Sequence, residues 1–181
     1  MYPTEIKIVA VGDGAVGKTS LLMVFNGEPF SERYVPTIFE NRIIETSIEN
    51  KPYNLHIWDT AGQEEFERLR HMSYNGANVI LLCFSLDSRT SFDSLRNKWL
   101  SEIKFFCNEA QIVVVGTKAD LQEIANRNHV KDEEAYRFVE ENKLFGYCRC
   151  SPKTGEGVQN VFVQATKSVA RRRRKFVCEM Y

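Results

Sequence analysis

Short apolar runs alternate along the chain with segments in which apolar residues recur every three or four positions. Continuous runs predict strands that are covered on both faces, whereas the wider spacing is typical of helices with one buried stripe. The apolar runs predict strands at residues 5–11, 41–49, 53–58, 79–84, 111–116 and 145–149. The spaced segments predict helices at residues 18–26, 91–107, 132–142 and 157–170.

Strands and helices that alternate in this way predict an α/β fold, with a six-stranded, mostly parallel sheet flanked by helices. A tight turn near Asn50 joins the second and third strands. Ligands of such sheets bind at the carboxyl ends of the strands. Residues that bind a ligand or take part in catalysis are therefore expected directly after each strand.

The composition favours one soluble domain, because 43% of the 181 residues are hydrophobic and 27% are charged. No run of 18 apolar residues exists, and the N-terminus lacks the basic region of a secretory signal. The five cysteines include Cys148 and Cys150, but no second pair completes a zinc site. We therefore expect reduced thiols.

The formal net charge is zero, but the charged residues are distributed unevenly along the chain. Residues 171–181 hold five basic residues and one acid, a net of +4, so residues 1–170 carry −4. An acidic body argues against general nucleic-acid binding, which usually needs a basic face on the folded domain.

The segment GDGAVGKT, Gly12–Thr19, follows the first predicted strand and fits the phosphate-loop pattern G-x-x-x-x-G-K-[ST]. Its glycines let backbone amides turn toward an anion, and the following helix adds its positive end. Lys18 is predicted to reach the β- and γ-phosphates, and the Thr19 hydroxyl to ligate Mg²⁺. The alternative is a glycine-rich structural turn. The predicted phosphate contacts are Gly14, Ala15, Val16, Gly17, Lys18, Thr19 and Ser20.

The segment TKAD, Thr117–Asp120, follows the fifth predicted strand. Guanine presents two adjacent donors, N1–H and the 2-amino group, and the Asp120 carboxylate can accept both. Adenine would leave that carboxylate unpaired, so such a site can reject it strongly. Lys118 is predicted to lay its aliphatic stem along the base. In isolation TKAD would be a solvated loop, but its place after a phosphate loop favours guanine.

The segment WDTAGQEEF, Trp58–Phe66, follows the third predicted strand. Asp59 is predicted to hold Mg²⁺ through water, and the Gly62 amide to approach the γ-phosphate. The Gln63 carboxamide can both accept from and donate to a water, which suits orienting that water for attack. The alternative for Gln63 is a polar loop residue.

Together these three motifs resemble the Ras superfamily of small GTPases over nearly the whole chain. Four stretches are similar to the Rho group, nearer Rho proper than Rac. They are YVPTIFEN (residues 34–41), TAGQEEFERLR (60–70), LLCFSLDSRTSF (81–92) and KWLSEI (98–103). The resemblance implies a single-domain P-loop GTPase fold over residues 1–170.

The resemblance also implies residue roles that the spacing of the motifs alone does not predict. Thr37 would bind Mg²⁺ and the γ-phosphate, Phe30 would pack edge-on against guanine, and Tyr34 would close over the phosphates. Residues 30–42 and 60–75 would be two switches that order when γ-phosphate is present. Lys18, Thr37, Gly62 and Gln63 would be the catalytic residues. Further nucleotide contacts would come from Pro36, Ser151, Pro152 and Lys153.

The implied activity is slow hydrolysis of GTP to GDP, stimulated by an arginine from a partner. The implied partners of this monomer are an exchange factor, an activating protein, a dissociation inhibitor and effectors such as formins or kinases. Trp58 would help select the exchange factor. The implied pathway is actin-cytoskeleton signalling.

Two features depart from the family pattern. Relatives usually have alanine at position 152, where the amide donates to guanine O6, and Pro152 has no N–H. Loss of that hydrogen bond predicts faster GDP release unless the Lys153 amide substitutes. The chain is also too short between Leu121 and Tyr147 to hold the extra helix of most Rho relatives.

Three other functions fit parts of the sequence. A P-loop kinase of small metabolites would need a lid that carries catalytic arginines, which the sequence does not show. Such a kinase would also have no use for the TKAD segment. A nucleotide-locked interaction module would bind without hydrolysis, which Gln63 argues against. A vesicle-trafficking or nuclear-transport GTPase fits the Rho-like switches less well.

The tail RRRRKFVCEMY, residues 171–181, resembles the polybasic ending and lipidated cysteine of Rho relatives. Prenylation of Cys178 together with five basic residues would provide the two signals that stable anchoring needs. Glu179 and Tyr181 depart from the usual motif. The alternatives are a shortened chain and a tail that binds by charge alone. We expect a cytoplasmic protein that cycles to the cytoplasmic face of the plasma membrane.

Overall fold

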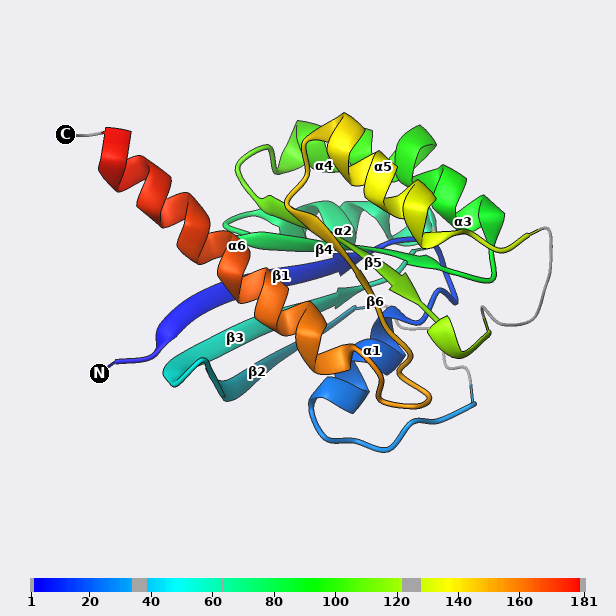
Figure 1. The fold of residues 1–181 in the computed structure, drawn as a ribbon, viewed down its shortest axis with the longest axis horizontal. Coiled ribbons are helices and arrows are strands. Elements are labelled where there is room, and N and C mark those ends of the chain that lie inside the picture. Colours follow the sequence, from blue (N-terminus) through cyan, green and yellow to red (C-terminus); the bar gives the residue numbers. More distant parts are fainter. Residues whose placement is uncertain (1, 34–38, 63, 122–127, 180–181) are drawn as a thin grey trace.

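The computed structural model describes residues 2–33, 39–62, 64–121 and 128–179, with the side chains of 39, 64 and 173–179 left out of the description. A six-stranded sheet carries helices on both faces, so the predicted α/β fold is confirmed (Figure 1). The strands are β1 (Thr4–Val11), β2 (Phe39–Ile48), β3 (Lys51–Thr60), β4 (Val79–Ser85), β5 (Gln111–Thr117) and β6 (Gly146–Arg149).

The strand order is β2-β3-β1-β4-β5-β6, and all neighbouring pairs are parallel except β2 and β3. The hairpin turn between β2 and β3 is formed by Glu49 and Asn50, whose φ angles are 51° and 61°. Two consecutive positive φ angles match the right-handed twist of the strands they join. The turn therefore includes Asn50, as predicted, and its other central residue is Glu49 rather than Lys51 or Pro52.

Each face of the sheet has its own hydrophobic core. One face packs against α1 (Lys18–Phe25) and α6 (Val158–Glu179), and Phe25 stacks on Phe162 with ring centroids 3.5 Å apart. The other face is covered by α2 (Glu67–Tyr74), α3 (Arg89–Ser94), α4 (Leu100–Phe106) and α5 (Asp132–Asn142) (Figure 1). Burial on both faces explains why β4 is apolar from Val79 to Phe84.

The single helix predicted for residues 91–107 is interrupted. A π-helical turn, Leu95–Trp99, lies between α3 and α4, and two short 3₁₀ turns occur at Glu64–Phe66 and Ala119–Leu121. Leu95 and Trp99 are both fully buried. Single π turns inside helices are frequent at functional sites, and this one brings Trp99 to the phosphate loop.

Two helices differ from the sequence prediction. Helix α2 was missed because it is mostly polar, and its central Arg70 is buried rather than exposed. Helix α6 was predicted to stop at Ala170, where its apolar stripe ends, but it continues to Glu179. Arginine and lysine are good helix formers, so nothing in residues 171–175 ends it.

The described cysteines, Cys83, Cys107, Cys148 and Cys150, are buried free thiols, as predicted. Burial raises the pKa of Cys83 to about 12 and that of Cys148 to about 11. These thiols are packing residues. None of the described helices combines the length and the apolar character needed to cross a bilayer.

Candidate nucleotide-binding site

A cavity of about 810 Å³ opens at the carboxyl ends of β1, β3 and β5. Cavities of this size hold ligands as large as nucleotides. It lies beside β1, where chain connections leave the sheet in opposite directions, and ligands of open α/β sheets bind at such a point. Residues 29–33, with Glu40 and Arg42 of β2, form one wall, and several other segments form the rest. The others include the phosphate loop (Gly14, Ala15, Gly17, Lys18, Thr19, Ser20), the end of β3 (Thr60, Ala61, Gly62) and the base loops (Lys118, Asp120, Leu121, Pro152, Lys153).

The phosphate loop is shaped by glycine at two positions. A Cβ on Gly12 would lie 2.1 Å from the carbonyl oxygen of Cys83, so the loop can pass β4 only because that residue has no side chain. Gly17 has a φ of 95° and begins α1, which directs the helix N-terminus at the cavity. Backbone amides at such a terminus attract anions.

The Lys18 side chain lies along the loop. Its ammonium donates to the carbonyl oxygens of Gly12 and Asp13, each at 2.8 Å, and only 6% of the residue is exposed. Burial lowers the pKa of this ammonium. A phosphate beside it would restore the favourable charge environment that burial removes.

Thr19 and Asp59 form a site that fits Mg²⁺. The Thr19 hydroxyl donates to Asp59 Oδ2 at 2.6 Å, while Asp59 Oδ1 is buried and has no hydrogen-bond partner among the described residues. Burial raises the pKa of this carboxyl. Hydroxyl and carboxylate oxygens are the ligands that Mg²⁺ prefers. A magnesium ion held directly by Thr19 and through water by Asp59 would satisfy the orphaned oxygen.

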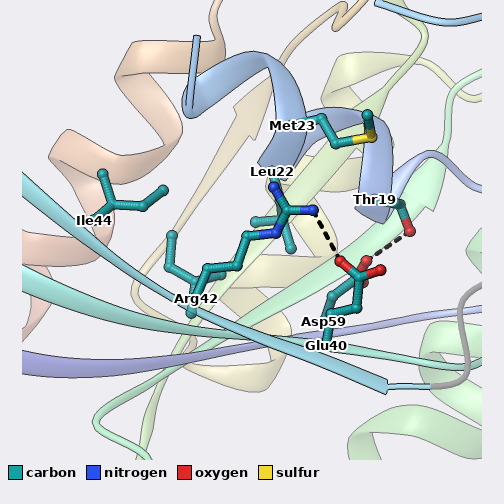
Figure 2. Close-up of a pocket in the computed structure, with 8 residues that line it drawn as sticks. Thr19, Leu22, Met23, Glu40, Arg42, Ile44 and Asp59 are labelled. Atoms are coloured by element: carbon teal, nitrogen blue, oxygen red, sulfur yellow. Dashed lines mark hydrogen bonds and ion pairs between the residues drawn. The ribbon is translucent and has the colours of Figure 1, made fainter. Parts of the chain in front are cut away.

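Arg42 and Glu40 face Thr19 and Asp59 from β2 (Figure 2). Arg42 Nη2 pairs with Glu40 Oε2 at 2.9 Å, and Arg42 Nη1 pairs with Glu28, which follows α1. One guanidinium thus joins the two ends of the segment between α1 and β2. The sequence did not predict this contact, because the spacing of charged residues along the chain does not show which of them form ion pairs.

Asp120, which the sequence predicts to bind the base, lines the cavity. Its Oδ1 accepts a hydrogen bond from the Ser151 hydroxyl at 2.5 Å, and Ser151 itself is fully buried. Lys118 lines the same part of the cavity and takes a left-handed backbone conformation, with a φ of 56°. Its ammonium lies 3.7 Å from Asp87 Oδ1. The carboxylate and the aliphatic stem that guanine recognition requires are therefore side by side.

The base end of the cavity also includes Phe30, Pro152 and Lys153. Lys153 Nζ pairs with Glu32 Oε1 at 3.0 Å, which fastens the segment carrying Phe30 to the loop after β6. Four of the predicted residues, Tyr34, Pro36, Thr37 and Gln63, lie outside the described residues. The prediction of a missing helix falls partly on residues 122–127, which are also outside them.

Four predicted nucleotide contacts, Val16, Asp59, Thr117 and Ser151, do not line the cavity. Asp59 is bonded to Thr19 and Ser151 to Asp120, both of which do line it. Val16 is buried, and Thr117 is fully buried with its hydroxyl directed at the carbonyl oxygens of Val16 and Phe84. Thr117 therefore ties the base-binding strand to the phosphate loop from behind. This role is structural support of the site rather than contact with its ligand.

A second buried support connects the phosphate loop to α2. The Trp99 indole donates to Asp13 Oδ1 at 2.7 Å, and the Arg70 guanidinium lies over the same ring, 4.7 Å from its centroid. Arg70 Nη1 also donates to the Ala61 carbonyl at 3.0 Å. Sequence reasoning missed Arg70, since nothing in the local pattern separates a buried arginine from the exposed Arg68.

The site thus combines a phosphate loop, an oxygen pair that fits Mg²⁺ and a carboxylate placed for guanine. A comparison with known protein families matches residues 7–171 to the Ras family. The match covers every residue that lines the cavity and all buried residues of the two hydrophobic cores except Ile6. The chain therefore belongs to the Ras family of small GTPases, proteins that bind GTP, GDP and Mg²⁺ and act with regulators and effectors.

Proposed function

We propose that the chain is a Rho-type switch, which hydrolyses GTP slowly and binds effectors while GTP is bound. The observation that carries the nucleotide assignment is that Lys18 and Thr19 share one cavity with Asp120, while Asp59 accepts a hydrogen bond from Thr19. The Rho assignment rests on the switch sequences at residues 34–41 and 60–70.

Different residues would have different roles in hydrolysis. Lys18 positions the phosphates and Gly62 brings its amide toward the γ-phosphate. Thr19, Thr37 and Asp59 would hold Mg²⁺, which, when bound, neutralises charge on the phosphate oxygens. Gln63 orients the attacking water. Catalysis of this kind depends mostly on positioning and charge, so a slow intrinsic rate is expected.

Stimulation would come from a partner. In the Ras family the intrinsic rate is on the order of 10⁻⁴–10⁻² s⁻¹ and rises by about 10³–10⁵ when an activating protein inserts an arginine; these magnitudes are taken from the family and not from this structure. Arg33 lies near the cavity, but Rho relatives do not use an arginine at this position for catalysis. The expected partners are an exchange factor, an activating protein, a dissociation inhibitor and effectors that bind residues 30–42 and 60–75.

The tail would determine where the switch operates. Five basic residues near an anionic leaflet contribute roughly 1 kcal/mol each, and one prenyl chain on Cys178 would add the second signal. We propose the cytoplasmic face of the plasma membrane as the site of action. Mass spectrometry of the protein from its own cells would reveal the lipid, and an unmodified Cys178 would leave charge alone as the anchor.

The switch mechanism is tested by Gln63→Leu. We expect GTP to bind normally and stimulated hydrolysis to be lost, measured as phosphate release in the presence of an activating protein. Gln159→Leu is the matched control, because Gln159 is exposed on α6 away from the cavity. Normal phosphate release from the Gln63 variant would refute the role.

The nucleotide assignment has a separate test. The nucleotide that copurifies with the chain is expected to be GDP or GTP when separated by chromatography. Recovery of ATP would overturn the guanine assignment, whatever the outcome with Gln63.

A further inference from the structure

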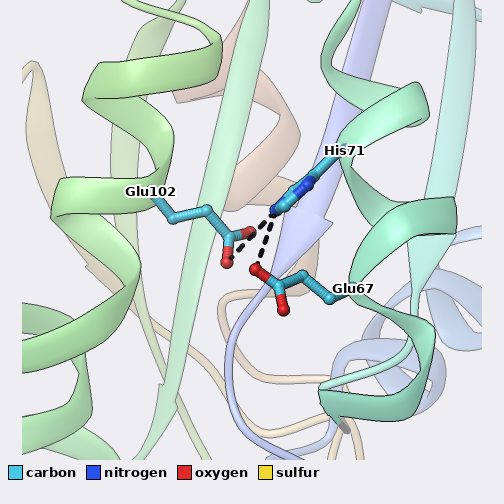
Figure 3. A group of neighbouring side chains, drawn as sticks. All are labelled: Glu67, His71 and Glu102. Carbon is cyan, nitrogen blue, oxygen red and sulfur yellow. Dashed lines mark ion pairs between the residues drawn. The ribbon is translucent and has the colours of Figure 1, made fainter.

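Three metal-ligating side chains meet between α2 and α4 (Figure 3). Glu67 and His71 lie one turn apart on α2, and Glu102 reaches them from α4. His71 Nε2 is 3.4 Å from Glu67 Oε1 and 3.8 Å from Glu102 Oε2. We call these three residues the α2–α4 cluster.

The His71 Nε2 atom makes no hydrogen bond within the described part of the chain, although it lies at ion-pair distance from both carboxylates. Its Nε2 is buried, faces both carboxylates and makes no hydrogen bond with either. Buried polar atoms without a partner are few and costly. The ring is held in this orientation by stacking on Phe106, with centroids 3.9 Å apart. The imidazole therefore points a nitrogen that makes no hydrogen bond at two carboxylates.

The Glu102 carboxylate is oriented by buried donors. Arg70 Nε and the Tyr74 hydroxyl both donate to Oε1, at 2.8 and 2.5 Å, and Arg70 Nη2 donates to Oε2 at 3.0 Å. Oε2 keeps a second lone pair on the side of His71. Hydrogen-bonded carboxylates of this kind are typical of metal sites, where outer partners fix the ligand.

We propose that the α2–α4 cluster binds a divalent transition metal of the zinc type, with water completing its coordination. One imidazole and two carboxylates form a ligand set that zinc accepts. Ligands at zinc distances in a tetrahedron lie about 3.3–3.5 Å apart. The separations from His71 Nε2, 3.4 and 3.8 Å, are close to this value, and all three ligand atoms lie within 4.8 Å of one another.

The ligand set separates this site from that of Mg²⁺. Magnesium prefers oxygen ligands in an octahedron and keeps several waters, whereas the α2–α4 cluster offers a nitrogen. The charge of Arg70 beside Glu102 weakens attraction for any dication. The affinity is therefore lower than that of a closed structural zinc site, and the metal exchanges.

Metal binding would affect the second switch. Glu67 and His71 lie on α2, within residues 60–75, while Glu102 lies on α4 outside the switches. The same Arg70 that orients Glu102 also donates to Ala61, next to Gly62. A bound ion would join α2 to α4 and favour the nucleotide state in which α2 has this position.

Calorimetric titration with zinc chloride tests the proposal. The full chain is loaded with GDP and kept in excess Mg²⁺, in a Cys178→Ser background because thiolates also bind zinc. We expect one zinc ion per chain and an affinity at least about tenfold lower for His71→Ala. His56→Ala is the matched control, since His56 also faces a carboxylate, Glu5, in an exposed pair.

A second variant and a second probe guard against misfolding of the first variant. Glu67→Gln changes a more exposed side chain and should lower zinc affinity while GDP remains bound. Cobalt in place of zinc should give visible absorption without the near-ultraviolet band of a thiolate, and His71→Ala should remove it. Absence of zinc binding in Mg²⁺ buffer, binding unchanged in both variants, or zinc that instead releases the nucleotide would each overturn the proposal.

Discussion

The Ser151 hydroxyl donates to Asp120 Oδ1 across 2.5 Å, and the Thr154 amide donates to the same hydroxyl oxygen at 3.2 Å. The serine is therefore fixed by its own loop and in turn fixes the carboxylate. Because a carboxylate that must accept two guanine donors loses binding energy if it can rotate, Ser151 contributes to affinity through orientation.

Ser151→Ala is expected to lower GDP affinity by about threefold to tenfold, the loss of one hydrogen bond of about 0.5–1.5 kcal/mol. Displacement of a fluorescent GDP analogue measures it. Ser168→Ala is the control, because Ser168 is an equally buried serine whose hydroxyl donates to Ala165 within α6. Equal affinities in the two variants would contradict the orienting role.

Pro152→Ala is expected to slow GDP release. The residue lines the base end of the cavity, and the substitution restores an N–H that can donate to guanine. One added hydrogen bond slows dissociation by a few-fold up to about tenfold. The measurement is the off-rate of a fluorescent GDP analogue in excess unlabelled GDP. Equal off-rates for the natural chain and the variant would contradict the hypothesis that Pro152 speeds nucleotide exchange.

Gly62→Ala should impair hydrolysis more than binding of GDP. A Cβ at this position would lie 2.4 Å from backbone atoms of Gly12, Asp13 and Gly14, so the end of β3 must move away from the phosphate loop. A displacement of about 1 Å in a catalytic site costs about 100-fold in rate. Single-turnover phosphate release measures the loss. A rate within twofold of the natural chain would show that the loop adapts.

Arg42→Ala is expected to accelerate GDP release by about twofold to fivefold. The guanidinium ties Glu28 to Glu40 across the segment that carries Phe30, and partly exposed ion pairs contribute about 0.2–1 kcal/mol each. High salt should shrink the difference, because it screens both pairs. Arg96→Ala breaks the exposed pair with Glu141 and serves as the control, with no expected change. Faster GDP release that does not depend on salt concentration would contradict a role for these ion pairs.

The phosphate loop and the base loop could be predicted because their chemistry is contiguous. Gly12–Thr19 and Thr117–Asp120 each contain, in one stretch, the residues that contact one part of the ligand. Continuous apolar runs likewise predicted the strands, since burial on both faces removes the need for polar positions.

The supports of the site could not be predicted in the same way. Trp99 and Asp13 lie 86 positions apart, and Ser151 and Asp120 lie 31 apart. Their pairing depends on the order of strands in the sheet, which spacing does not encode. Helix α2 was missed for a related reason, because its buried face is formed by Arg70, Ser73 and Tyr74 rather than by an apolar stripe.

The position of Trp99 has a practical consequence. The chain has two tryptophans, and Trp99 is bonded to Asp13 of the phosphate loop while Trp58 immediately precedes Asp59. Indole emission responds to nearby charge and to hydrogen bonding of the ring nitrogen. The protein therefore contains its own optical probe bonded to the phosphate loop, and its nucleotide cycle can be followed by intrinsic fluorescence without a label.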